Sequence, residues 1–256
     1  MIEITSASNP RYKTIKSLSL KKERLKRKEF TVEGIKSVRD AIKAGAVIDR
    51  IVVSDSFYKN TDFDYPPNAH ILKTDDRIFE KLCDTETPQG IMAVIKMKNT
   101  EGFVFDKSKD YVYCDNVKDP GNLGTIIRTA DAAGLGGVLL SKGCVDLYNP
   151  KTVRASMGSF FAVDIYRNIE YNTLEVMKRN GFSIIGGALS ENSADYRDAD
   201  YSSPCVIIVG NEANGMSEEA LSLCNPVKIP ILGSAESLNV SVAAALLIYE
   251  IVRNRS

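Results

Sequence analysis

Three glycine-bearing segments in the second half of the chain hold the residues that could do chemistry, and each follows a strand-like apolar run. The first is DNVKDPGNLGTIIRTADAAG, in which we predict a helix that starts near Thr125 after the Pro-Gly turn. Asn122 would stand at the strand end and Arg128 would project from the opening turns, so both could reach the crevice where open α/β sheets bind ligands. The structural alternative is that Arg128 pairs with Asp131, three residues further on.

The second and third segments offer main-chain groups and polar side chains. VIIVGNEANGMS carries Gly210 at a strand end with Glu212 just beyond it, and a glycine there lets a ligand approach the backbone closely. An ordinary Asn-Gly turn before a helix capped by Ser217 explains the same residues. VKIPILGSAESLNVSVAAA places Ser237 and Asn239 before the final helix, where they either face a polar ligand or act only as helix caps.

Several other chemistries lack the residues they need. The one histidine, His70, lies in a loop-like stretch, which argues against a Ser-His-Asp triad and a multi-histidine metal site. The five cysteines form no C-x-x-C pair, and we expect free, mostly buried thiols. The N-terminus does not read as a signal peptide and no apolar run is long enough to span a membrane, so we expect a cytoplasmic protein without a membrane partner.

Charge is unevenly distributed although the formal net charge is zero. Residues 11–28 contain nine Lys or Arg and one Glu. Such a local excess suits a phosphate backbone, because each neutralised phosphate releases condensed counterions. A solvated basic helix with no partner is the alternative.

The elements that position these residues follow an α/β pattern. From Tyr111 onward, apolar runs including YVYCDNV, GGVLLS, FFAVDIY, FSIIGGAL and PCVIIVG alternate with helix-length segments, which predicts a mostly parallel sheet with helices on both faces. Shorter alternating elements before it predict a smaller α/β domain. We place that domain at residues 1–100, a polar linker at 101–110 and the larger domain at 111–256. The apolar final helix packs in the core or forms a dimer interface.

The order and content of the three segments resemble the signature motifs of the SpoU family of the SPOUT methyltransferases. The motifs stand here as NLGTIIRTADAAG, IVGNEANGMS and IPILGSAESLNVSVAAA, within the part of the chain that begins at Tyr111. The N-terminal half resembles, more loosely, a small RNA-binding domain of the ribosomal protein L30e type, through FTVEGIKSVRDAI and ETPQGIMAV.

The resemblance implies a deep trefoil knot, a topology that is otherwise nearly absent from proteins. It also implies S-adenosylmethionine as methyl donor, held in a bent shape chiefly by main-chain groups, without a metal. By motif matching these groups belong to Gly210, Ile229 and Leu238, and we also expect Leu189 and Leu232 at the donor. The family works as a homodimer, which predicts active sites that draw on both subunits.

The implied reaction is methyl transfer to a ribose 2′-hydroxyl of RNA, an in-line displacement that depends on alignment. We expect Arg128 to meet the ribose and its phosphate, while Asn122, Glu212, Ser237 and Asn239 shape the pocket. A guanidinium keeps its proton above roughly pH 12, which favours an orienting role for the arginine over a general base. Glu212 is a secondary candidate for accepting the hydroxyl proton through water.

Other readings of the chain remain open at this point. The L30e-like domain favours ribosomal RNA, with transfer RNA as the alternative, and Arg154 is a further candidate phosphate contact. A catalytically silent RNA-binding protein would share the same fold. A nucleotide-dependent oxidoreductase would also use glycine-rich turns in a parallel sheet, but the G-x-G-x-x-G fingerprint is missing.

Overall fold

The computed structural model describes residues 1–98, 100, 102–190, 192–202 and 204–255. The chain forms two compact units. One contains Met1–Asn99 and Tyr148–Phe161, and the other contains Thr100–Leu147 and Ala162–Ser256. The sequence-based division at residues 100 and 110 stays a prediction.

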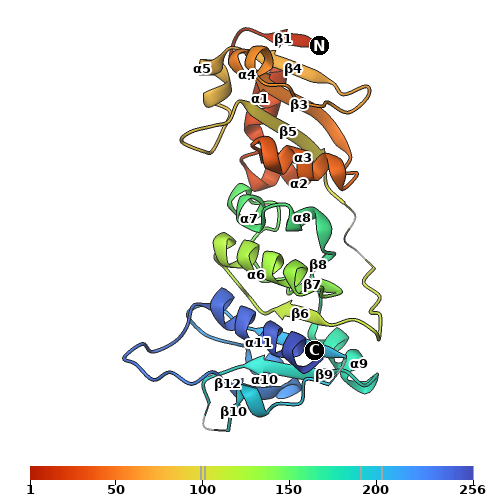
Figure 1. Ribbon diagram of the computed structural model, residues 1–256, viewed down its shortest axis with the longest axis vertical. Coiled ribbons are helices and arrows are strands. Elements are labelled where there is room, and N and C mark those ends of the chain that lie inside the picture. The colour runs from red at the N-terminus through yellow and green to blue at the C-terminus, as the bar shows by residue number, and fades with distance from the viewer. Residues whose placement is uncertain (99, 101, 191, 203, 256) are drawn as a thin grey trace. The chain divides into compact units, whose positions relative to one another are not determined.

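The first unit is a mixed α/β structure (Figure 1). Its described residues form a five-stranded sheet in the order β1-β4-β3-β5-β2, in which β5 runs antiparallel to β2 and β3 and the other pairs are parallel. The elements are β1 (Ile2–Ile4), α1 (Pro10–Ser17), α2 (Lys21–Arg27), β2 (Glu29–Glu33), α3 (Ile35–Lys43), β3 (Ile48–Ser54), α4 (Asp55–Asn60), β4 (Ile71–Thr74), α5 (Asp76–Glu80) and β5 (Ile91–Lys96).

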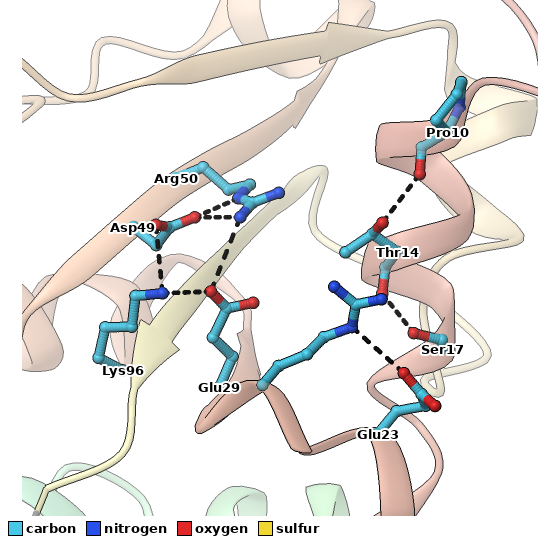
Figure 2. Close-up of polar contacts among 9 residues, drawn as sticks. Pro10, Thr14, Ser17, Glu23, Glu29, Asp49, Arg50 and Lys96 are labelled. Carbon is cyan, nitrogen blue, oxygen red and sulfur yellow. Dashed lines mark hydrogen bonds and ion pairs between the residues drawn. The ribbon is translucent and has the colours of Figure 1, made fainter. Parts of the chain in front are cut away.

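Ion pairs connect charged side chains at one end of this sheet, where β2 and β3 begin and β5 ends (Figure 2). Glu29 on β2 and Lys96 on β5 are cross-strand neighbours and form an ion pair. The register of β3 against β5 shifts between Ile48 and Arg50, and Arg50 pairs with Asp49 and lies 3.8 Å from Glu29. The nearly buried Glu29 carboxylate is therefore neutralised by two cations, as a carboxylate removed from water requires.

The segment Tyr148–Phe161 completes the core of the first unit although it lies far along the sequence. It contributes α7 (Pro150–Ser156) and most of α8 (Ser159–Ala162). The ring of Phe30 lies 4.8 Å from that of Tyr148 and 5.5 Å from that of Phe160, and all three side chains are buried. The prediction of FFAVDIY as one strand is thus wrong in its first half, because Phe160 and Phe161 are helical and pack as core aromatics.

The second unit is built on a parallel sheet, as predicted (Figure 1). Seven strands of the described residues pair in the order β10-β12-β9-β11-β6-β7-β8, with every pairing parallel. The elements are β6 (Tyr111–Cys114), α6 (Pro120–Ala132), β7 (Gly137–Leu140), β8 (Ile165–Arg167), α9 (Tyr171–Arg179), β9 (Ser183–Gly187), β10 (Ala194–Asp195), a 3₁₀ turn (Tyr196–Asp198), β11 (Cys205–Val209), α10 (Glu218–Leu223), β12 (Asn225–Lys228) and α11 (Val240–Arg255).

The central strands are buried on both faces, which explains their continuous apolar runs. Every residue of β6, β7 and β11 is buried, although successive side chains point to opposite sides. Helix α6 packs against α11, and α9 packs against α10. The terminal residue of α11 that the structure describes, Arg255, forms an ion pair with the buried Asp110 at the start of β6.

Two helix starts differ from the sequence-based prediction. Helix α6 begins at Pro120, not near Thr125, because the Asp119 side chain accepts a hydrogen bond from the Asn122 N–H and Pro120 takes the first helical position. From the sequence NTLEVMKRNG we expect a helix capped by Asn172 or Thr173, but helix α9 begins at Tyr171 and its capping position is Glu170. The Ser217 cap of α10 is confirmed, since its hydroxyl accepts from the Ala220 N–H at 3.2 Å.

The structure also bears on membrane spans and disulfides. Among the described residues, no helix has both the length and the apolar character that crossing a bilayer requires. All five cysteines are free, and Cys114, Cys205 and Cys224 are buried, as expected. The trefoil knot stays a prediction.

Candidate functional site

A cleft of about 540 Å³ opens at the carboxyl ends of β9, β11 and β12. The segments after these strands line it together with the start of α11, at the edge of the sheet where parallel α/β folds bind their ligands. Residues 210–216 form one continuous wall, since all seven line the cleft. Of the residues predicted to hold the methyl donor, those that line the cleft are Gly210, Ile229, Leu238 and Leu189.

Gly210 is a glycine for a steric reason. A Cβ atom added to it would lie 2.3 Å from the main-chain atoms Gly215 C and Met216 N, closer than any side chain tolerates. The loop that follows β11 therefore folds back directly over the backbone of Gly210, and Asn211 and Gly215 close it with reciprocal main-chain hydrogen bonds of 2.8 and 2.9 Å. This tight turn presents main-chain groups to the cleft.

A chain of hydrogen bonds joins one polar side chain from each of the three predicted segments. The Asn122 amide on α6 donates to Glu212 Oε1 at 3.1 Å, and the Asn239 amide donates to Asn122 Oδ1 at 2.9 Å. Asn239 Oδ1 in turn accepts from the Ser241 N–H and hydroxyl in the first turn of α11. The three segments therefore meet in one place, at the rim of the cleft that Glu212 and Asn239 line.

The Glu212 carboxylate accepts three hydrogen bonds in this arrangement. Besides the Asn122 amide, it accepts from the main-chain N–H of Lys118 at 3.0 Å and of Asp119 at 2.9 Å. Burial alone would raise the pKa of Glu212, but the hydrogen bonds from Lys118, Asn122 and Asp119 outweigh that effect and lower it. A carboxylate with a lowered pKa and three donors is a poor proton acceptor and a good anchor for the loop before α6.

The remaining predicted residues lie in different surroundings. Ser237 lines the cleft and is exposed. Arg128 is exposed on α6 outside the cleft lining, and within the described residues its guanidinium makes no hydrogen bond or ion pair, including the alternative one with Asp131. Leu232 is 98% exposed and also lies outside the lining. Arg154 is an exposed residue of α7 in the other unit.

Asp115 and Tyr171 belong to the surroundings of the cleft, and sequence reasoning missed both. Asp115 is completely buried, and it accepts hydrogen bonds from the Tyr171 hydroxyl and from the Ser217 N–H directly after the cleft-lining loop. An acidic residue that follows the apolar strand YVYC without a break was a usable signal for Asp115. Tyr171 carried no comparable signal, because a tyrosine that opens a helix is usually a packing residue.

Groups of three or more metal-ligating side chains are missing from the part of the chain that the structure describes. The thiols are also poorly suited to nucleophilic chemistry. Burial raises the pKa of Cys205 and of Cys83 to about 12, which keeps both protonated near neutral pH.

Two family models match the chain. The model of the SpoU rRNA Methylase family matches residues 109–249, which contain all three signature segments and the cleft. The model of the MRM3-like substrate binding domain matches residues 9–93.

Relatives match over nearly the whole chain. The 23S rRNA (guanosine(2553)-2'-O)-methyltransferase RlmP of Bacillus subtilis is 38% identical over 98% of this chain and 99% of its own length. The crystal structure of an AdoMet-bound rRNA methyltransferase from Sinorhizobium meliloti is 33% identical, with a TM-score of 0.87 over 98% of this chain and 97% of that one.

A more distant structure has the same architecture. The SpoU methyltransferase AviRb from Streptomyces viridochromogenes, solved in complex with AdoMet, is 26% identical, with a TM-score of 0.83 over 96% of this chain and 98% of that one. Together with the convergence of the three signature segments on one cleft, these matches establish that the chain belongs to the SpoU rRNA methylase family.

Proposed function

We propose that this chain transfers a methyl group from S-adenosylmethionine to a ribose 2′-hydroxyl of ribosomal RNA. The observation that carries the proposal is the hydrogen-bonded chain Glu212, Asn122 and Asn239, which joins the three signature segments at the rim of one cleft. RlmP aligns with nearly the whole chain, and its name gives 23S rRNA as the molecule that it methylates. This similarity supports ribosomal RNA as the substrate.

The cleft fits a donor of this kind. Its volume of about 540 Å³ lies within the range of small-molecule sites, roughly 300 to 1,000 Å³. Main-chain groups near Gly210, Ile229 and Leu238 would hold its polar parts, and the close approach of the backbone at Gly210 leaves no room for a side chain there. The bound donor supplies a methyl group already activated by a positively charged sulfur.

The protein's own contribution to the reaction is orientation. We assign Arg128 to the ribose and its phosphate, because an exposed guanidinium without an ion pair among the described residues can bind an anion with its planar fork of donors. Asn122, Asn239 and Ser237 orient the hydroxyl. Glu212 holds Asn122 and the loop before α6 instead of taking the proton, because its carboxylate already accepts three hydrogen bonds.

The basic surface on α1 and α2 suits the backbone of the RNA. Two of its nine cations have structural roles: Arg24 is buried and donates to the Leu18 and Ser19 carbonyls, and Arg27 pairs with Glu23 at 3.3 Å. The exposed cations that remain include Arg11, Lys13, Lys21, Lys22, Lys26 and Lys28. We assign phosphate binding to these side chains, in line with the substrate-binding domain model that covers them.

We further propose that two copies of the chain associate through α11. Val242, Leu246 and Tyr249 are 48%, 38% and 49% exposed and recur at the spacing of one helix face. An apolar stripe of this kind on a helix that borders the cleft is best explained by a second copy that covers it. Because modification of ribosomal RNA takes place where ribosomes are assembled, the proposal includes the cytoplasm as its location.

Transfer of a tritiated methyl group from S-adenosylmethionine tests the function directly. Purified 23S ribosomal RNA should take up label as alkali-resistant 2′-O-methyl dinucleotides, while transfer RNA from the same cells should not. Label in transfer RNA alone would overturn the substrate assignment. Donor binding without transfer to any RNA would instead support a non-catalytic RNA-binding protein.

A further inference from the structure

A buried carboxylate lies directly behind the cleft, at the end of β6. Asp115 has an exposed fraction of 0%, and an ionised carboxylate in such a position is costly unless donors surround it. Its Oδ1 accepts from the Tyr171 hydroxyl at 2.7 Å and from the Asn116 amide at 2.8 Å, and its Oδ2 accepts from the Ser217 N–H at 2.7 Å. Asp115 thus joins the ends of three elements, β6, α9 and α10.

Tyr171 provides a second hydrogen-bonded link between Asp115 and Ser217. Its hydroxyl donates to Asp115 and accepts from the Ser217 hydroxyl at 3.0 Å. Burial raises the pKa of Tyr171 and the neighbouring Asp115 adds to that effect, so the phenol keeps the proton that it donates. Ser217 is therefore held through both its main-chain N–H and its side chain, immediately after the cleft-lining residues 210–216.

The other end of the same loop is held by the residue next to Asp115. The side-chain amide of Asn211 donates to the main-chain carbonyl of Asn116 at 2.9 Å. Asn116 has a positive φ of 57°, a conformation that asparagine tolerates better than most residues. The dipeptide Asp115-Asn116 consequently fixes the loop at its first and last turns, while the loop lines the cleft between them.

We propose that Asp115 and Tyr171 are positioning residues that hold residues 210–216 in the conformation that binds the adenosyl donor. The donor named here rests on the proposed function. Neither side chain lines the cleft, so both act through the loop. If the loop were released from Ser217, only a fraction of molecules would have the competent conformation, and the apparent donor affinity would fall by that fraction.

The test is isothermal calorimetry of S-adenosylmethionine binding to the full-length Tyr171→Phe variant. This substitution keeps the ring and removes only the hydroxyl that bridges Asp115 and Ser217. We expect the dissociation constant to rise about three- to tenfold, the loss that one typical intramolecular hydrogen bond produces, because Ser217 keeps its main-chain hydrogen bond to Asp115. The turnover number at saturating donor should stay close to wild type, because bound donor restores the loop.

Tyr113→Phe is the matched control. Tyr113 lies in the same core, with its ring centroid 6.0 Å from that of Tyr171, and its buried hydroxyl donates to the Ile169 carbonyl at 3.0 Å rather than to the loop. We expect it to lower the thermal midpoint at least as much as Tyr171→Phe does, yet leave the donor dissociation constant unchanged.

The possible results separate this inference from the proposed function. Wild-type affinity in Tyr171→Phe, or equal weakening in both variants, would show that the hydroxyl does not act through the loop and would overturn the inference. Failure of the wild-type protein to bind the donor would overturn the proposed function, and the ligand assigned here would fall with it.

Discussion

The side-chain amide of Asn122 donates to Glu212 Oε1 at 3.1 Å, although 90 positions separate the two residues in the sequence. The first turn of α6 and the loop after β11 are therefore held together by a charge-assisted hydrogen bond. Since Asn239 donates to the same Asn122, a continuous chain of hydrogen bonds connects Glu212 to the start of α11.

Glu212→Gln should lower kcat/KM about ten- to a hundredfold, the cost of replacing a charged acceptor that receives three hydrogen bonds. The Lys118 and Asp119 N–H groups donate to different oxygens of Glu212. A glutamine amide has only one oxygen, so one of the two N–H groups would face an NH2 group and lose its acceptor. Steady-state methyl transfer measures the effect. An unchanged rate would contradict the role assigned to the carboxylate.

The pH dependence of stability provides a separate check on Glu212. The pKa of Glu212 in the folded protein lies below the ordinary glutamate value. The ionised carboxylate therefore stabilises the fold at pH values above the ordinary pKa, and this stabilisation is lost as the pH falls through the folded-state pKa. The difference in unfolding free energy between wild type and Glu212→Gln should be largest near neutral pH and should shrink as the pH falls below the ordinary glutamate pKa toward the lower folded-state value. Urea titrations over this range measure it, and a difference that grows on acidification would refute the assignment.

Arg128→Ala should reduce methyl transfer by at least about a hundredfold while donor binding stays near wild type, because the side chain lies outside the cleft lining. Arg128→Lys should restore little, since an ammonium lacks the planar fork of a guanidinium. Single-turnover assays combined with calorimetry distinguish chemistry from donor binding. Normal turnover in the alanine variant would rule out the role of Arg128.

Replacement of Lys21, Lys22 and Lys26 together by alanine should weaken RNA binding and make it less sensitive to salt. Loss of three phosphate contacts should reduce the slope of log affinity against log salt by about two to three. Lys36→Ala is the control, because this exposed lysine of the same unit pairs with Asp40 at 3.8 Å. Filter binding at several salt concentrations measures the slope, and equal changes in both proteins would contradict the assignment to α1 and α2.

Leu246→Lys should separate the proposed dimer into monomers, because it places a charge in the centre of the apolar stripe on α11. Val176→Lys on α9 is a matched control, since both side chains are 38% exposed. Light scattering coupled to size exclusion gives the masses. A wild-type protein that elutes as a monomer, or a dimer that survives Leu246→Lys, would count against α11 as the interface.

The sequence predicted the parallel sheet and the cleft residues better than it predicted the details around them. Apolar runs such as YVYC and VIIV mark strands buried on both faces, and these runs became β6 and β11. The start of α6 was missed because Pro-Gly reads as a turn, whereas the preceding Asp119 makes Pro120 a favourable first helical residue.

Long-range contacts explain most of what the sequence could not reveal. The three donors to Glu212 belong to Lys118, Asp119 and Asn122, which lie 94, 93 and 90 positions away in the sequence. No local pattern encodes such a pairing, so the sequence left Glu212 open as a proton acceptor. The same holds for Tyr171, whose partners Asp115 and Ser217 are 56 and 46 positions distant.

Residues 148–161 belong to the same compact unit as residues 1–99, which affects where the protein can be cut into stable fragments. Phe30 is 2% exposed because the rings of Tyr148 and Phe160 cover it. A fragment that stops at residue 99 would leave this phenylalanine open to water and would aggregate more readily than the intact chain. Supplying residues 148–161 as a separate peptide should restore its solubility, in the manner of fragment complementation.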